Sequence, residues 1–193
     1  MKPPILNIPI VLASKSPRRK QLLEEAGFTF RIQALDVDES FPDTLPKQEV
    51  AAYIAEKKAR ASKHFLQSGE VMLTADSVVL LGDTIYEKPK DRADAIRILQ
   101  ALSGRKHQVI TGVCLLNKEK HQTFSGVSEV HLQPLSQEEI EYYIDTYQPF
   151  DKAGSYAIQE WIGHCKISRI EGLYTNIMGL PVELVYQHLQ DFL

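Results

Sequence analysis

The spacing of hydrophobic and polar residues alternates along the chain between a period of two, typical of strands, and a period near 3.6, typical of helices. Apolar runs bounded by turn residues predict strands at 8–14, 29–33, 71–81, 107–117, 121–133 and 165–170. Helical spacing, with Ser, Pro or Gly near the ends, predicts helices at 17–26, 47–67, 91–102, 136–145 and from about 181. Residues 34–46 hold four acidic residues and two prolines, and predict a mobile loop.

The order of these elements predicts the mixed α/β class, with a twisted sheet and flanking helices. A turn at 117–120 separates the two long strands at 107–117 and 121–133, so they should form a hairpin and make the sheet partly antiparallel. No linker rich in Pro, Gly or Ser interrupts the chain. Residues 1–193 are therefore expected to form a single domain.

The composition adds limits on function. Hydrophobic residues make up 44% and charged residues 24% of the 193 residues, which excludes disorder as the dominant state. The net charge is −3, whereas proteins that bind nucleic acids usually carry a positive excess. We therefore expect no nucleic-acid partner, and a phosphate site would need local clustering of positive charge.

Neither a membrane span nor an export signal is expected. No apolar run approaches the roughly 20 residues of a membrane helix. The apolar segment at the N-terminus is broken by Pro9 and is better explained as the first buried strand. Cys114 and Cys165 show no C-x-x-C spacing, which favours two buried or half-buried thiols in a reducing cytosol, and hence a cytoplasmic location.

The run from Ser14 to Lys20 is the first candidate for chemistry. Ser16 fits a helix N-cap and Pro17 the first helical position, so unpaired N–H groups should be exposed there. Four cations fall within six residues, and arginine can hold phosphate oxygens with two parallel hydrogen bonds. From the residues alone, a phosphate site and an ordinary solvated helix start are equally favoured.

Asp76 and a pair of lysines are the next candidates. Asp76 lies in an otherwise apolar strand, where a buried carboxylate needs a partner, so it is a candidate metal ligand or proton acceptor. Alternation places Thr74 and Asp76 on the same face of that strand. Lys57 and Lys58 fall inside or beside the apolar stripe of the helix at 47–67, and spacing alone does not choose between them.

Other segments carry weaker signals. Pro89 holds Lys88 extended, although a plain charged turn explains that tetrapeptide better. Gln159 follows a stretch of small residues and offers both a donor and an acceptor, which suits the edge of a nucleobase. The tyrosines between 142 and 147 and Trp161 are expected to serve packing. The six histidines show no zinc-binding spacing.

Taken in order, these segments resemble the Maf family of nucleoside triphosphate pyrophosphatases, over about Val11 to Leu184. The segments that carry the resemblance are Ala13–Arg19, Lys58–Ala61, Ala75–Val79, Glu87–Pro89, Leu102–Val109, Asp151–Gln159 and Met178–Pro181. The resemblance implies hydrolysis of a nucleoside triphosphate to the monophosphate and pyrophosphate with a divalent cation, Mg²⁺ or Mn²⁺. It also implies two lobes around a central cleft, similar to the inosine triphosphate pyrophosphatases. The Gly-x-Tyr-x-Ile-Gln form at 154–159 looks like the branch acting on dTTP and UTP.

The resemblance also implies roles for single residues. Asp76 would be the proton acceptor. We add the hypothesis that Asp76 and Glu39 of the acidic loop hold the metal. Lys58 and Lys88 would be the lysines of the cleft. The positions expected to bind substrate are Ser14, Arg18, Arg19, Ser77 and Gln159.

Four positions depart from the family pattern. Lys15 replaces a small residue, Ser77 the usual Thr, Lys57 a frequent Glu, and Leu173 a common Ser. These departures are compatible with the hydrolysis reaction, but they affect the expectation of which nucleotide is preferred.

Three other functions stay open at this stage. The chain could hydrolyse 7-methyl-GTP or another purine nucleotide. It could be a regulator of septum formation that binds nucleotide without turnover, since the family name is tied to septum inhibition. It could also bind nucleic acid through Arg18 and Arg19, although its net charge disfavours this. A homodimer is one form that the sequence allows.

Overall fold

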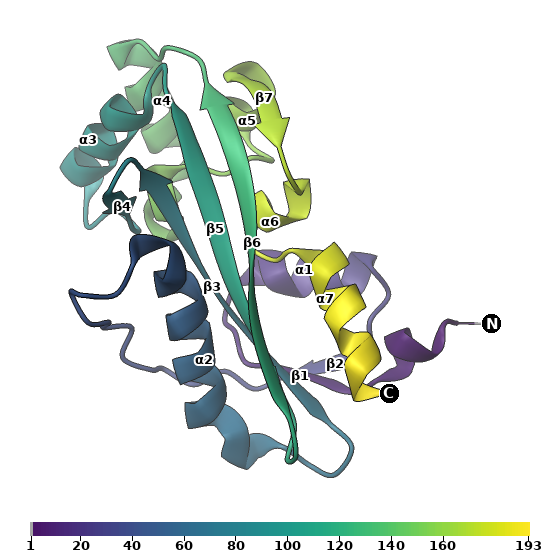
Figure 1. Cartoon of the computed structure of the whole chain (residues 1–193). Helices are drawn as coiled ribbons and strands as arrows, with labels where there is room; N and C mark the ends of the chain where they lie inside the picture. The colour runs from purple at the N-terminus through teal and green to yellow at the C-terminus, as the bar shows by residue number, and fades with distance from the viewer. Residues whose placement is uncertain (1) are drawn as a thin grey trace. The chain divides into compact units, whose positions relative to one another are not determined.

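The computed structural model describes residues 2–193 and contains a mixed sheet with helices packed on it (Figure 1). The strands are β1 (Ile10–Leu12), β2 (Phe30–Ile32), β3 (Val71–Leu81), β4 (Thr84–Tyr86), β5 (Lys106–Leu116), β6 (His121–Leu132) and β7 (Ile167–Glu171). Their order is β2-β1-β3-β5-β6-β7, and β4 pairs with β3. β1 is parallel to β2 and β3, whereas β3–β4 and β6–β7 are antiparallel. The predicted α/β class with a mixed sheet is confirmed.

Helices lie between the strands and after the last strand. They are α1 (Pro17–Glu25), α2 (Val50–Ser62), α3 (Arg92–Leu102), α4 (Gln137–Tyr147), α5 (Trp161–Cys165), α6 (Tyr174–Met178) and α7 (Val182–Leu189). Short 3₁₀ turns lie at Pro4–Asn7, Lys47–Glu49, Lys63–Phe65, Pro149–Asp151, Ala153–Ser155 and Gln190–Phe192. Ser16 caps α1, and Ser136 forms a capping box with Glu139 at the start of α4.

Several predicted boundaries were wrong. β1 covers only three residues of the strand predicted at 8–14. The helix predicted at 47–67 is a 3₁₀ turn, α2 and a second 3₁₀ turn. The strand predicted at 165–170 begins at Ile167 because α5 precedes it. β4, α5 and α6 were not predicted, because elements of three to five residues are too short to show a period.

The chain divides into two compact units. The first unit contains the chain up to Asp76, Thr111–Gly126 and Gly179–Leu193, and the second contains Ser77–Ile110 and Val127–Met178. Strands β3, β5 and β6 each contribute residues to both units. The prediction of one domain over residues 1–193 stays a prediction.

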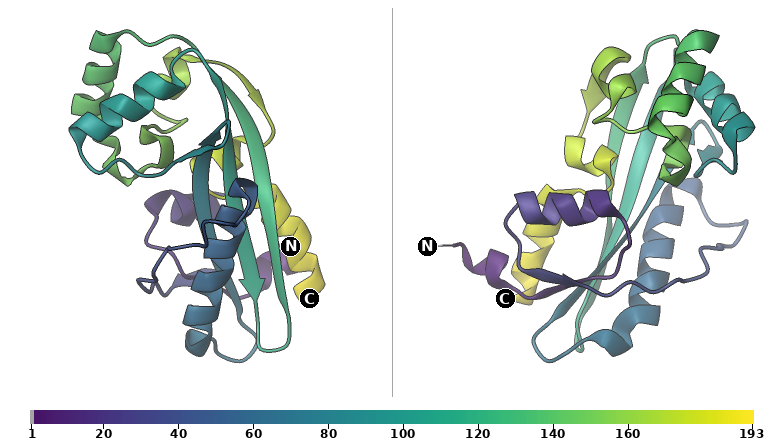
Figure 2. Two further views of the ribbon diagram at one scale, coloured as in Figure 1. Left: turned by 60° about the vertical axis from the view of Figure 1, so that its left-hand side comes forward. Right: turned by 180° about the vertical axis from the view of Figure 1, so that it is seen from behind.

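In the first unit, α2 lies on one face of the strands, and α1 and α7 lie on the other (Figure 2). The core under α2 is formed by small and medium apolar residues, Val11, Ala13, Ala55, Ala59, Met72, Cys114 and Leu116. Gly112 of β5 faces the α2 backbone: an added Cβ would lie 2.2 Å from the Ala52 nitrogen. α2 therefore packs against the sheet closely enough to require glycine at this position.

In the second unit, α3 and α4 pack together over an apolar core. The core includes Val79, Leu99, Val130, Ile144 and Ile162, which are all at most 4% exposed. These residues come from β3, β6 and three helices, so the core fixes the loops that connect them.

A buried histidine lies in the second unit. His107 is 2% exposed, and its Nε2 lies 2.7 Å from the Tyr156 hydroxyl. Burial lowers the pKa of His107 to about 4. The imidazole is therefore neutral in the folded protein at neutral pH.

This histidine should make stability fall in acid. An unfolded His107 gains a proton as pH falls below about 6.5, whereas the folded chain resists protonation until about pH 4, so stability should be lost between these values. The expected contribution is about 3 kcal/mol. Urea unfolding at pH 7.5 and 4.5 should show a shallower pH dependence for His107→Gln than for the wild type. His64→Gln, at an exposed histidine, should keep the wild-type dependence; equal slopes in all three proteins would contradict this prediction.

Both cysteines are free thiols. Cys114 is buried as expected, but Cys165 is exposed, because it lies at the last turn of α5. The expectation of two buried or half-buried thiols was therefore wrong for Cys165. Among residues 2–193, none of the helices has both the length and the apolar character needed to span a membrane.

Candidate active site

The start of α1 is built as the sequence predicts. The Ser16 hydroxyl accepts a hydrogen bond from the Arg19 nitrogen at 3.5 Å, and the Ser14 hydroxyl accepts one from the Ser16 nitrogen at 3.2 Å. The helix begins soon after the carboxyl end of β1, a strand with parallel neighbours on both sides. A helix N-terminus at the carboxyl ends of parallel strands is a common place for an anion.

Arg19 is held from two sides within the first unit. Its Nε donates to the Gly179 carbonyl at 2.8 Å, and its Nη1 donates to the Ser14 hydroxyl at 3.3 Å. Burial lowers the pKa of Arg19 below its ordinary value, and Arg18 lowers it further, while Asp76 and Glu39 act in the opposite direction. The guanidinium is thus fixed in place, with charges of both signs around it.

Asp76 pairs with Lys58 across the contact of β3 with α2. The Lys58 Nζ lies 2.7 Å from Asp76 Oδ1 and 2.6 Å from Glu39 Oε1. The Lys58 and Asp76 side chains are only 15% and 12% exposed, so this ion pair is largely removed from water. One ammonium group therefore bridges the two carboxylates that the sequence analysis selected as metal ligands.

The alternation predicted for β3 is confirmed at two positions. The Thr74 hydroxyl donates to the Ala55 carbonyl of α2 at 2.6 Å, and Asp76 accepts from Lys58 of the same helix. Both side chains thus face α2. Thr74 fixes the register between strand and helix, a role that its sequence context did not indicate.

Lysines hold the acidic loop in place. Lys15 pairs with Asp36 at 2.6 Å, and Lys57 pairs with Asp38 at 2.8 Å and donates to the Ser40 carbonyl at 3.1 Å. Hydrogen bonds from Lys57 and Ser40 lower the pKa of Asp38. Lys57 and Lys58 therefore have different partners: Lys57 pairs with the loop, whereas Lys58 joins the loop to Asp76. The two departures Lys15 and Lys57 both serve this loop.

The remaining predicted residues lie in the second unit. Ser77 is half-buried on β3, Lys88 is exposed after β4, and Gln159 is half-buried before α5. The Gly154 nitrogen donates to the Glu87 carbonyl at 3.2 Å, which ties the segment that leads to Gln159 to the loop of Lys88. The Gln159 Oε1 is buried and has no hydrogen-bond partner within residues 2–193. The first unit holds Ser14, Arg18, Arg19, Glu39, Lys58 and Asp76.

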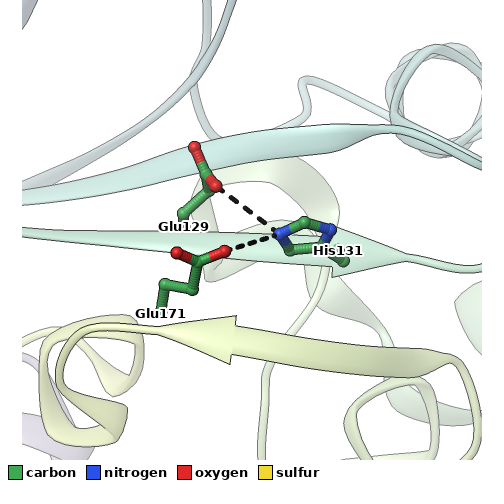
Figure 3. A group of neighbouring side chains, drawn as sticks. All are labelled: Glu129, His131 and Glu171. Atoms are coloured by element: carbon green, nitrogen blue, oxygen red, sulfur yellow. Dashed lines mark hydrogen bonds and ion pairs between the residues drawn. The ribbon is translucent and has the colours of Figure 1, made fainter.

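A separate group of titratable side chains lies on β6 and β7 of the second unit (Figure 3). Glu129 and Glu171 are opposite each other in the strand register, and His131 Nε2 lies 3.5 and 3.3 Å from their carboxylates. Like charges in opposed positions repel, and Lys106 and Arg169 also pair with these glutamates at 2.9 and 3.2 Å. The group is thus a charge-compensated strand pair, and we do not include it in the site.

Comparison with known proteins shows the family of the chain. The model of the family described as Maf-like protein matches residues 9–192, so the chain belongs to the Maf family. The relative from Porphyromonas gingivalis is 49% identical over 186 residues, which cover 95% of this chain and 94% of the relative. Relatives from Bacteroides thetaiotaomicron and Flavobacterium psychrophilum are 46% and 44% identical, and each alignment covers 94% or 95% of either chain. All three relatives are named dTTP/UTP pyrophosphatase.

Solved structures align over shorter parts of the chain. The Ham1 protein of Staphylococcus aureus aligns with 64% of this chain and 71% of its own, with a TM-score of 0.46 and 16% identity. The dITP/XTP pyrophosphatase of Mycobacterium abscessus aligns with 64% and 72%, with a TM-score of 0.37 and 16% identity.

Proposed function

We propose that this chain hydrolyses nucleoside triphosphates, dTTP and UTP foremost, to the monophosphate and pyrophosphate. Its role would be to remove unwanted nucleotides from the cellular pool. The observation that carries this proposal is the cluster of Arg19, Lys58, Asp76 and Glu39 beside the start of α1. The names of the relatives support the same reaction and the same substrates.

In this proposal the cations bind the triphosphate. Arg18 and Arg19 lie in the first turn of α1, where the N–H groups of the helix start add to their positive charge. Lys58 supplies an ammonium group from α2, and Lys88 would supply a second one. Positive groups fixed before the reaction stabilise the charge that develops on the pyrophosphate leaving group.

The carboxylates fit a divalent cation. Asp76 and Glu39 already place one oxygen each within 2.7 Å of a single positive group, the Lys58 ammonium, so they converge on one cation position. Carboxylate oxygens are the ligands that Mg²⁺ and Mn²⁺ prefer. When held by these carboxylates, such an ion would polarise the phosphoryl oxygens.

Asp76 would also take the proton from the attacking water. It is the more buried of the two carboxylates, with 12% of its side chain exposed against 47% for Glu39. Its hydrogen bond with Lys58 and the Thr74 anchor two residues earlier hold it at a fixed position. A fixed carboxylate within hydrogen-bond reach of a water can act as a general base.

Gln159 and Ser77 would recognise the base. The Gln159 Oε1 is a buried acceptor that lacks a donor in the described part of the chain. Thymine and uracil carry a hydrogen on N3, whereas cytosine has a lone pair there. A carbonyl oxygen at this position would therefore favour dTTP and UTP over dCTP.

The test is a measurement of pyrophosphate release from a panel of nucleotides with Mg²⁺ or Mn²⁺. dTTP and UTP should be hydrolysed faster than dCTP, ITP and 7-methyl-GTP, and a chelator should stop the reaction. Faster turnover of 7-methyl-GTP or ITP would show that purine nucleotides are the preferred substrates. If calorimetry shows that nucleotide binds but no pyrophosphate is released, the chain is a nucleotide-binding regulator and not an enzyme.

We also propose the cytoplasm as the compartment. Both cysteines are free, and the exposed thiol of Cys165 suits a reducing environment.

Lys58 and Lys57 provide a matched pair of variants. Lys58→Met should lower kcat/KM for dTTP roughly tenfold to 100-fold, because a charged hydrogen bond contributes about 1.5–3 kcal/mol. Lys57→Met removes the same charge from the neighbouring residue, which pairs with Asp38 and Ser40 of the acidic loop, and should change kcat/KM less than threefold. Steady-state kinetics of both variants measure the difference, and equal losses would remove Lys58 from its proposed role.

A further inference from the structure

Tyr143 of α4 is a buried residue with a hydroxyl that makes two contacts. It is among the largest fully buried side chains, and its hydroxyl accepts a hydrogen bond from the Ala157 nitrogen at 3.0 Å. The same hydroxyl donates to Oε2 of Glu160. Packing explains the ring, which stacks on Tyr147, but it does not explain these hydrogen bonds.

Glu160 is held on its other side as well. Lys152 Nζ lies 3.5 Å from Glu160 Oε1 and 2.7 Å from Asp151 Oδ1, and the Lys152 side chain is only 11% exposed. Burial weakens the competition from water for these ion pairs. The Tyr143 hydroxyl is therefore part of a connected group that fixes Glu160.

Gln159 lies between the two residues that Tyr143 holds. Ala157 is two residues before it and Glu160 directly follows it. The backbone between them is also constrained, because a Cβ at Gly163 would lie 1.6 Å from the Ile158 carbonyl oxygen. The buried Oε1 of Gln159 has no partner within residues 2–193, so the segment holds a polar atom ready for a donor from outside the chain.

We propose that Tyr143 is a positioning residue that sets base selectivity by fixing Gln159 from both sides. This inference rests on the proposed function, in which Gln159 accepts a hydrogen bond from the base. A hydrogen bond discriminates between bases only while its acceptor is held in place, and the Tyr143 contacts hold the residues on either side of Gln159, from which its side chain extends.

The hydroxyl can serve this role across the physiological pH range. Burial, together with the hydrogen bond to Glu160, raises the pKa of Tyr143 well above its ordinary value. The hydroxyl therefore keeps its proton across the physiological pH range.

The test compares Tyr143→Phe with Tyr147→Phe. Both variants lose one hydroxyl from α4, but the Tyr147 hydroxyl makes no hydrogen bond in the described part of the chain, although its ring stacks on Tyr143. Tyr143→Phe should lower the ratio of kcat/KM for dTTP to that for dCTP about tenfold, through a higher KM for dTTP, with kcat within about twofold. Tyr147→Phe should keep the wild-type ratio. An unchanged ratio in folded Tyr143→Phe overturns the inference.

Variants at Glu160 separate positioning from folding. Glu160→Gln keeps an acceptor for the Tyr143 hydroxyl and should keep most of the selectivity, whereas Glu160→Leu should lose it as Tyr143→Phe does. Circular dichroism at the assay temperature shows whether each variant is folded, and a purely structural role would lower the folded fraction without changing the ratio. If the wild type hydrolyses no triphosphate, the proposed function fails; if it is selective and Tyr143→Phe is equally selective, only this inference fails.

Discussion

Replacement of Asp76 by Asn is expected to lower kcat/KM for dTTP about 1,000-fold, within the range that a general base contributes. Asparagine has nearly the same shape and can still accept a hydrogen bond from Lys58, so the contact of β3 with α2 should be preserved. It cannot take a proton from water, and it removes one of the two charges that converge on the Lys58 ammonium. The measurement is pyrophosphate release over a range of dTTP concentrations.

The control for this variant is Asp83→Asn. Asp83 lies two residues after the end of β3, in an exposed turn, so the same chemical change is made far along the strand from Asp76. Its kcat/KM should stay within twofold of the wild type. An Asp76→Asn protein that is folded and fully active would remove Asp76 from the base role. A large loss of kcat/KM in Asp83→Asn would show that loss of any negative charge lowers activity, whatever its position.

The second large effect is expected from Gly112→Ala, which should destabilise the protein by at least about 3 kcal/mol, the upper part of the range for overpacked sites. The added methyl group would lie 2.2–2.4 Å from backbone atoms of Ala51 and Ala52. Backbone cannot turn aside as a flexible side chain can, so α2 would have to move away from β5. Because α2 carries Lys58, activity should fall together with stability.

Urea unfolding measures this effect, and Gly69→Ala is the comparison. Gly69 has a φ of 80°, but a Cβ there would meet nothing within 4 Å, so its substitution should cost only about 1 kcal/mol for the strained backbone. Gly112→Ala should therefore unfold at clearly lower urea than Gly69→Ala. Equal midpoints would show that α2 can move away from β5 at little cost.

Features of the fold and of the site could be predicted from the sequence where one side chain determines the local structure. Ser16 and Pro17 predicted the start of α1, and an acidic residue inside an apolar strand predicted that Asp76 has a partner. The period of two predicted that Thr74 and Asp76 face the same way. Each of these inferences uses residues that are neighbours along the chain.

The rest depends on contacts between distant segments. The spacing of α2 could not choose Lys58 over Lys57, because both lie near its apolar stripe, and only the position of β3 distinguishes them. The residues that flank Gly112 in the sequence do not indicate that it packs against the backbone of α2. Tyr143 was expected only to pack, because a tyrosine pattern shows where the ring is buried and not what its hydroxyl contacts. The charge pattern of the acidic loop does not reveal which lysine each carboxylate meets.

The two anchors between β3 and α2 limit where the length of this chain can vary. Thr74 contacts Ala55 and Asp76 contacts Lys58, so the strand advances two residues while the helix advances three. Inserting or deleting one residue between Thr74 and Asp76 would turn the carboxylate to the opposite face of the sheet and leave Lys58 beside a residue that cannot pair with it. Insertions and deletions can therefore be accommodated in the turns at 82–83 and 117–120, whereas the segment from Thr74 to Asp76 must keep its length.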